Sequence, residues 1–109
     1  MVIPKDATIA VEKVRDYLLK PREKKDKSKY LAIAGYSRAQ YQRLINDLRD
    51  LLPAEAELQS QTRFGDRFIF RCKLRGPNGT ILPVCTIWED HNVLGWKFIT
   101  LYPDKEKRR

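Results

Sequence analysis

The feature that most constrains this chain is a segment in its second half, residues 67–75, where basic and apolar side chains alternate. The alternation has period two, the side-chain period of a β-strand. One side is apolar: Phe68, Phe70, Cys72 and Leu74. The other side is cationic, apart from Ile69: Arg67, Arg71, Lys73 and Arg75. Such a strand buries one face only, which predicts a sheet covered on one side and open on the other.

A turn follows this strand, and the return strand determines what shares its two faces. Gly76-Pro77-Asn78-Gly79 is a strong turn signal, and residues 80–89 are expected to form the partner strand. Placing Arg75 opposite Thr80 puts Phe70 opposite Cys85. The apolar face then gains Ile81, Pro83, Cys85 and Ile87, and the basic face gains Thr80, Leu82, Val84, Thr86 and Trp88. A basic row beside tryptophan and hydroxyls suits a phosphate backbone and a stacked base, although an ordinary solvated face is the alternative.

The first half of the chain has helical patterns. Three helices are expected: from Asp6 or Thr8 to about Lys20, from Ser28 to Ala34 with Gly35 after its end, and from a capping box at Ser37 to about Leu52. Strands are expected at 57–62 and 96–102, besides the hairpin. The prediction is an α+β fold, with N-terminal helices on one face of a roughly four-stranded antiparallel meander. The 109 residues suit one domain: helical part 6–52, sheet part 56–103 and a frayed basic tail 104–109.

The facing of the last strand depends on a single residue of register. Counting from Glu89 opposite Trp96 places Ile99 and Leu101 on the basic face, whereas burying them exposes Phe98, Thr100 and Tyr102. We favour the second arrangement, with a bulge near Gly95.

Charge and cysteine content limit the classes of function. The chain has 22 Lys and Arg against 14 Asp and Glu, a formal net charge of +8, which favours an anionic partner. It contains no apolar run long enough to span a bilayer and no recognisable signal peptide, so a cytoplasmic protein without membrane contact is expected. Cys72 and Cys85 are expected to be buried thiols on one face. One histidine and two cysteines make a metal site improbable, and no cofactor is expected.

A metal-independent ribonuclease remains possible with these residues, because RNA supplies its own 2′-hydroxyl nucleophile. Lysine and arginine can stabilise the phosphorane, and tyrosine, lysine or histidine can transfer protons. The candidate catalytic residues are Lys29, Arg71, Thr86, Thr100, Tyr102 and His91. The candidate RNA-binding residues are Arg67, Lys73, Arg75, Trp88, Lys25 and Lys27. Each has an ordinary alternative: a solvated charge run at 20–29, an exposed loop histidine, and a tryptophan that caps the sheet edge.

Several short segments, in this order, resemble a bacterial toxin-associated family of domains of unknown function (DUF 6883-like). They are Ile3-Pro4, Tyr17-Leu18-Leu19 with Pro21, Lys29 before Gly35-Tyr36, Gly76-Pro77-Asn78-Gly79, Thr86-Ile87-Trp88 and Thr100-Leu101-Tyr102-Pro103. The layout is similar to the barnase, EndoU, colicin and RelE group of ribonuclease toxins. The resemblance implies Lys29, Thr86, Thr100 and Tyr102 as site residues. The loop at 22–27 departs from the family by lacking a glycine and a histidine.

The sequence therefore supports three hypotheses. The leading one is a small ribonuclease toxin of a toxin–antitoxin pair, with RNA as substrate and a cognate antitoxin protein as partner. The second is a non-catalytic nucleic-acid-binding module. The third is an interaction or immunity protein whose basic face binds an acidic partner.

Overall fold

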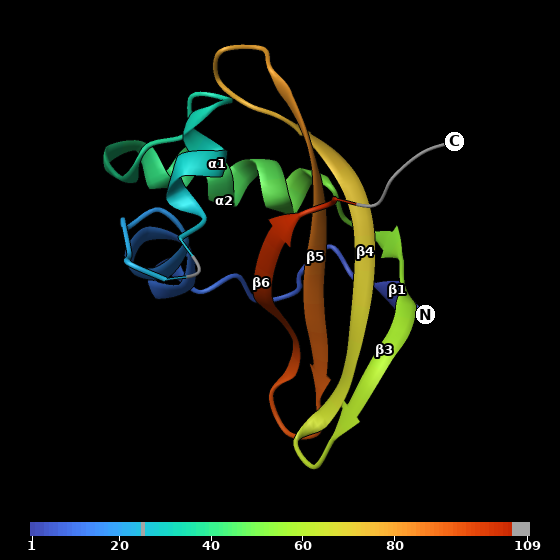
Figure 1. The fold of residues 1–109 in the computed structure, drawn as a ribbon. Coiled ribbons are helices and arrows are strands. Elements are labelled where there is room, and N and C mark those ends of the chain that lie inside the picture. The colour runs from blue at the N-terminus through green and yellow to red at the C-terminus, as the bar shows by residue number, and fades with distance from the viewer. Residues whose placement is uncertain (25, 106–109) are drawn as a thin grey trace.

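The structure is a computed structural model that describes residues 1–24 and 26–105. Four strands form an antiparallel sheet in chain order: β3 (Glu57–Thr62), β4 (Gly65–Arg75), β5 (Ile81–His91) and β6 (Gly95–Pro103). The helical segments precede the sheet in the chain and lie along one side of it (Figure 1). This is the α+β meander that the sequence predicts. The expected strand at 57–62 is confirmed residue for residue.

The helices are shorter than their sequence patterns suggest. They are a π-helix η1 (Lys13–Leu18), α1 (Ser28–Ala32), a 3₁₀-helix η2 (Arg38–Gln40) and α2 (Tyr41–Asp50). The first helical segment begins later than expected because Thr8 is extended and bridges Lys97 at the edge of β6. The expected capping box is absent, since Ser37 makes no side-chain capping bond. A two-stranded sheet of β1 (Val2–Ile3) and β2 (Ala54–Glu55) was not foreseen.

The core lies between the helices and the apolar face of β4, as the alternation predicts. Leu44 and Leu48 of α2 and Leu31 of α1 are fully buried in one cluster with Phe68 and Leu74 of β4. Burying such side chains contributes about 1.5–3 kcal/mol each, which explains why short helices are stable here and not alone.

The β4–β5 register differs by one residue from the expected one. Arg75 pairs with Ile81, not Thr80, so Phe70 lies opposite Thr86 and Phe68 opposite Trp88. Thr80 belongs to the turn, where its carbonyl accepts a bond from the Gly76 amide and its amide donates to the Asn78 side chain. A one-residue shift exchanges the two faces of a strand. The residues of β5 therefore divide between the faces in the opposite way to our prediction.

A bulge in β6 sets the facing of the last strand. Trp88 pairs with Phe98 and Ile87 with Thr100, so Ile99 is an extra residue between these two pairs. As favoured from the sequence, Thr100 and Tyr102 share the face of Arg71. Phe98 does not share it, because the bulge lies at Ile99 and not near Gly95; its ring is 1% exposed and packs edge-on against Trp88.

The β4–β5 turn packs on the end of α1. Asn78 donates through its backbone amide to the Ala34 carbonyl and through its side chain to the Ile33 carbonyl. A Cβ at Gly76 would lie 2.2 Å from the Ala34 carbonyl oxygen, so only glycine fits there. This turn, 45 residues away in sequence, satisfies carbonyl groups that the end of a short helix leaves without partners.

The cysteines lie on opposite faces of the sheet, which corrects the expectation of a shared face. Cys72 lies opposite Val84 on the helix-covered side, and Cys85 lies opposite Arg71 on the other. They do not form a disulfide. Burial raises the pKa of the Cys72 thiol to about 12, so this group stays protonated and unreactive near neutral pH.

Candidate functional site

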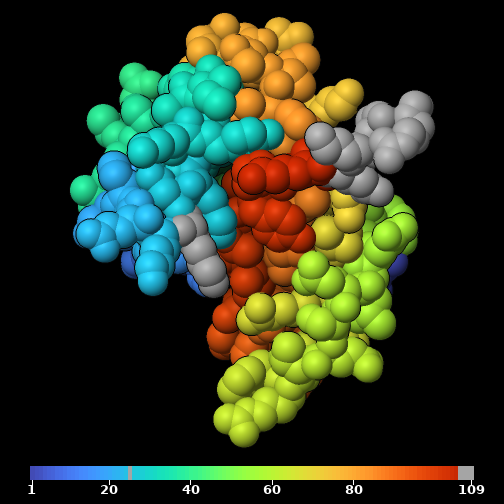
Figure 2. Space-filling model, viewed as in Figure 1, coloured from blue at the N-terminus to red at the C-terminus, as the bar shows by residue number. Residues whose placement is uncertain are grey.

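The face of the sheet opposite the helices is the candidate functional surface. In Figure 2 the red atoms of β6 and the orange atoms of β5 lie between the blue-to-teal helical segments on one side and the lime atoms of β3 on the other. Its apolar floor consists of Cys85 and Ile87, which are buried yet separate from the core cluster under the helices. We call this surface the open face. Around its floor lie side chains of three strands, β3, β4 and β6: Glu57, Arg67, Ile69, Arg71, Lys73, Thr100 and Tyr102.

The basic row on β4 is partly neutralised within the molecule. Arg67 Nε donates to Glu89 Oε1 at 3.0 Å, and the Glu89 side chain is only 3% exposed. Glu89 lies directly opposite Arg67 on β5 because of the one-residue register shift. A buried carboxylate needs such a partner, since an unpaired one loses several kcal/mol of hydration. Arg67 therefore orders the floor and is less available to a ligand than the sequence suggested.

Arg71 occupies the centre of the open face. Its Nη1 lies 3.2 Å from Asp104 Oδ1, just after β6. Beside it is a hollow of about 380 Å³, lined by Cys85, Tyr102 and residues 103–105. Arg71 thus links β4 to the segment just after β6, and Tyr102 of β6 lines the same hollow. Two of the predicted catalytic residues, Arg71 and Tyr102, therefore line one hollow.

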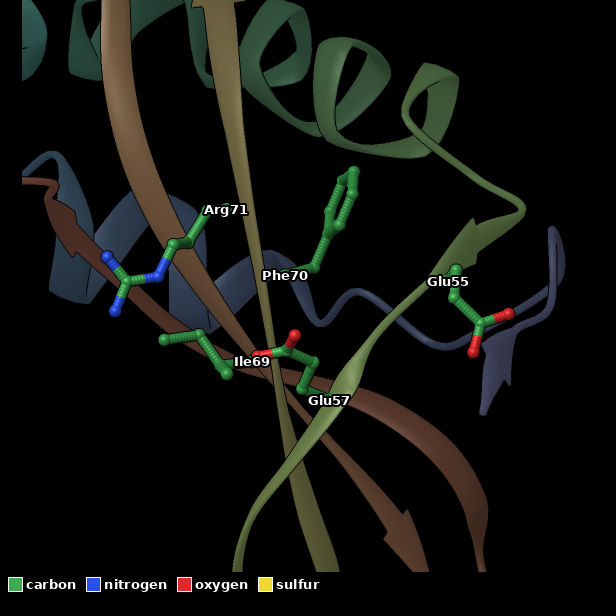
Figure 3. Close-up of a pocket in the computed structure, with 5 residues that line it drawn as sticks. All are labelled: Glu55, Glu57, Ile69, Phe70 and Arg71. Atoms are coloured by element: carbon green, nitrogen blue, oxygen red, sulfur yellow. The ribbon is translucent and has the colours of Figure 1, made fainter.

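A second hollow beside Arg71 is also lined by two glutamates. It has a volume of about 230 Å³ and is lined by Glu55, Glu57, Ile69, Phe70 and Arg71 (Figure 3). Figure 3 shows Arg71 and Ile69 pointing to the same side of β4, whereas Phe70 points to the opposite side. Glu57 lies directly opposite Ile69 across β3 and β4. The open face therefore carries both signs of charge, a feature that the residues of β4 alone do not reveal.

The chain around Lys27 closes the open face at the edge of β6. Lys27 Nζ donates to Thr100 Oγ1 at 3.1 Å and lies 5.2 Å from the centre of the Tyr17 ring. The Arg22 guanidinium lies 4.6 Å from the same ring, so two cations flank one tyrosine. Tyr17 and Thr100 also line a hollow of about 410 Å³ between η1 and β6. Tyr17 follows Val14 at a spacing typical of the buried face of a helix, so nothing in the sequence predicted this cluster.

Thr86 and Trp88 are not part of any surface site, contrary to prediction. Both side chains are 0% exposed on the helix-covered face. Trp88 Nε1 donates to Thr86 Oγ1 at 2.9 Å, and Thr86 Oγ1 donates to the Phe70 carbonyl oxygen at 2.8 Å. Their polar groups are thus satisfied within the core, as buried polar groups require. The register shift in the hairpin is the reason, because it turned these residues inward.

The remaining candidates do not converge on Arg71. His91 ends β5, six residues beyond Cys85, or about 20 Å along a strand. Its Nδ1 accepts the amide bonds of Val93 and Leu94, and its ring stacks on Phe64. Lys29 is exposed on α1, while Lys27 occupies the position beside Thr100. Lys73 and Arg75 are exposed at the end of β4, and Lys25 and the tail from residue 106 lie outside the described residues.

Two properties of the described residues bear on the class of protein. Within residues 1–24 and 26–105, no group of three or more His, Cys, Asp or Glu side chains could hold a metal ion. No helix in the same ranges has the length and apolar character to cross a membrane.

Comparison with known proteins gives one family and one fold. A family model described as a domain of unknown function (DUF6883) matches residues 4–105. A chain of the contact-dependent growth inhibition toxin–immunity protein complex from Klebsiella pneumoniae 342 has a similar structure, with a TM-score of 0.62 and 17% identity. The match covers 93% of this chain and 96% of that one. No curated protein is similar enough to count as a match.

These findings correct the leading hypothesis of a ribonuclease toxin. The structural similarity to a chain of a toxin–immunity protein complex favours the third hypothesis, an immunity or interaction protein. The structure weakens the ribonuclease hypothesis independently, because Thr86 and Trp88 are buried and His91 lies at the far end of the sheet. Nothing in the comparisons supports RNA as the partner.

Proposed function

The chain belongs to the DUF6883 family of domains of unknown function, and we propose that it acts as an interaction protein of the immunity type. In this proposal it binds an acidic partner protein through the open face and catalyses no reaction. The observation that carries the proposal is the composition of that face: a buried apolar floor within a ring of cations and fixed ion pairs. Protein interfaces combine an apolar centre with a polar rim in the same way.

The structural similarity supports this reading. The matched chain belongs to a complex of a toxin with its immunity protein, a setting in which the fold serves protein–protein binding. A match over 93% of the chain means that the likeness includes both the sheet and the helices.

The charges indicate how such a partner would be recognised. Lys73 and Arg75 are exposed and, among the described residues, form no ion pair, so they can attract acidic groups at long range. Arg67 and Arg71 are already held by Glu89 and Asp104, so they present fixed donors. In this proposal Lys73 and Arg75 chiefly raise the rate of association with the partner. Arg67 and Arg71 chiefly fix the orientation in which the partner binds.

Binding of candidate partners tests the proposal. The purified protein would be mixed with the proteins encoded on either side of its gene, and complexes would be measured by size-exclusion chromatography and calorimetry. The wild type is expected to bind one of them. Lys73→Glu/Arg75→Glu should weaken that binding about tenfold or more, mainly through slower association. The control, Lys20→Glu/Lys24→Glu, makes the same charge change in the exposed loop before α1.

A nuclease assay provides the opposing outcome. Total RNA and transfer RNA incubated with the protein in EDTA should remain intact, and expression of the chain should not slow growth. Binding that is equally weak for both charge-reversal variants would place the interface elsewhere. Specific RNA fragments, or tight RNA binding without any protein partner, would overturn the proposal.

A further inference from the structure

The hollow between η1 and β6 lies at the edge of the open face, with which it shares Thr100. Its volume is about 410 Å³, within the range of ligand pockets in proteins. Its lining comes from two parts of the chain that are far apart in sequence: Ala10, Glu12, Lys13, Tyr17, Ile99 and Thr100. We call it the η1–β6 pocket.

The β6 bulge creates the floor of this pocket. Ile99 is the extra residue between the pairs formed by Phe98 and Thr100, so it faces neither the core cluster nor the partner strand. With Ala10 and the ring of Tyr17 it forms an apolar interior. A regular strand would have turned Ile99 onto one face of the sheet, and this pocket would lack its floor.

The rim of the pocket is cationic. Lys13 belongs to the lining, and Lys27 is held at Thr100 by a 3.1 Å hydrogen bond. Arg22 lies over the Tyr17 ring, whose face attracts cations. Among the described residues, Glu12 is the acidic side chain of the lining, and Asp26, which lies next to Lys27 in the chain, accepts a backbone hydrogen bond from Arg22. Three cations against two carboxylates leave the rim with one net positive charge.

We propose that the η1–β6 pocket is an anchor site for the partner protein, an inference that rests on the proposed function. It receives one aromatic or large aliphatic side chain from a segment of the partner whose neighbouring residues are acidic. The apolar floor selects the anchor, and the cationic rim selects its acidic neighbours. Interfaces concentrate their binding energy in such anchors, which fill a pocket and exclude water.

Peptides test this chemistry without knowledge of the partner. The probe is a pentapeptide with phenylalanine between two acidic residues on each side, titrated into the labelled full chain and followed by amide chemical shifts. We expect shifts at Lys13, Tyr17 and Ile99. Two control peptides, one with alanine at the centre and one with lysines in place of the acids, should bind at least about fivefold more weakly.

Matched variants test the pocket itself. Ala10→Phe fills the space, and its control, Ala39→Phe, adds the same ring at an exposed position on η2. Lys27→Gln removes a rim charge, and its control, Lys24→Gln, removes one from the exposed loop. The two pocket variants should bind the phenylalanine peptide about tenfold and threefold more weakly, respectively, while the controls bind as the wild type does. Amide spectra of all four variants verify the fold.

The outcomes separate this inference from the proposed function. Equal binding of all three peptides, or shifts confined to the open face, would overturn the pocket as an anchor site. So would tighter binding of adenosine monophosphate than of the peptide, which would make it a small-molecule site. If a full partner binds Ala10→Phe as well as it binds the wild type, only the anchor site fails. If no protein partner binds while the peptide still fills the pocket, the proposed function fails and the pocket keeps only its preference for an aromatic residue between acids.

Discussion

The two faces of the sheet are built from the same strands but differ in how they accommodate polar and charged side chains. On the helix-covered face, Thr86 is the one fully buried polar side chain among the described residues, and it is bonded to Trp88 and to the backbone. On the open face, apolar residues such as Ile87 are buried beneath charged ones, and the buried carboxylate of Glu89 is held by Arg67. One face gains stability by excluding charge, and the other keeps charge in fixed positions.

This difference shows which residues remain available for recognition. The hydroxyl and indole that suited a nucleic-acid site are used to satisfy the core. The arginines that suited a phosphate contact are held by acids on neighbouring segments. A residue type therefore indicates possible chemistry, but its partners decide what chemistry remains.

The largest expected effect comes from the helix-covered face. Trp88→Ala should lower the free energy of unfolding by about 3–5 kcal/mol, because it removes a fully buried ring and leaves a cavity against Phe98. Urea denaturation measures this loss. The control is Val93→Ala, since Val93 is 84% exposed and its truncation should change stability little. Similar losses for the two variants would contradict the assignment of Trp88 to the core.

A smaller loss is expected for the ion pair on the open face. Arg67→Ala leaves the carboxylate of Glu89 buried without its partner and should cost about 2–3 kcal/mol, less than a fully buried pair because Arg67 is half-exposed. Denaturation curves of the double variant Arg67→Met/Glu89→Leu are the decisive comparison. That variant should regain most of the lost stability, because it removes both charges. A double variant as unstable as Arg67→Ala would mean that packing, and not the unpaired charge, causes the loss.

The polar pair of the core provides a third test. Thr86→Val keeps the shape of the side chain but removes the acceptor of the Trp88 indole, so about 1–2 kcal/mol of stability should be lost. Thermal and urea unfolding should agree on this loss. The conservative replacement Thr86→Ser should keep most of the stability. Wild-type stability of Thr86→Val would show that the indole finds another acceptor.

The smallest effect is expected at an exposed ion pair outside both faces. Arg15 and Arg38 donate to Asp16 and hold its pKa well below the ordinary value near 4. Because the folded-state pKa is depressed, the ion pair stabilises the protein above about pH 4 and loses this effect as pH falls through the folded pKa. Asp16→Asn should therefore lower the melting temperature slightly at pH 7, and the gap should close toward pH 2. A gap that is constant with pH would exclude the ion pair as its cause.

The sequence predicted the order of the elements better than their facing. Alternation in β4 and the stop signals around the strands depend on local chemistry, so the meander and the covered side of β4 followed directly. Which side chains of β5 point to the core depended on whether Thr80 belongs to the strand or to the turn, a difference of one residue in register. Facing in β6 was correct for Thr100 and Tyr102 because burial of Leu101 favours it, but the position of the bulge had no local signal.

The candidate site was harder to predict, because its partners come from distant segments. Asp104 follows the last strand and Glu57 lies on the first, so neither is near Arg71 in sequence. Tyr17 has the spacing of a core residue, and only the bond from Lys27 to Thr100 shows that cations gather above it. Composition revealed a basic protein but could not show which cations are already paired.

The bonds from the β4–β5 turn to the end of α1 imply an order of events as the protein folds. A helix of five residues does not persist alone in water, because too few hydrogen bonds compensate the ordering of its backbone. The hairpin closes locally and is expected to form first. Only then can Asn78 donate to the Ala34 and Ile33 carbonyls. The carbonyl groups at the end of α1 therefore find their partners in a turn 45 residues later in the chain. Helix α1, which is synthesised before the hairpin, is therefore expected to reach its final structure after the hairpin has formed.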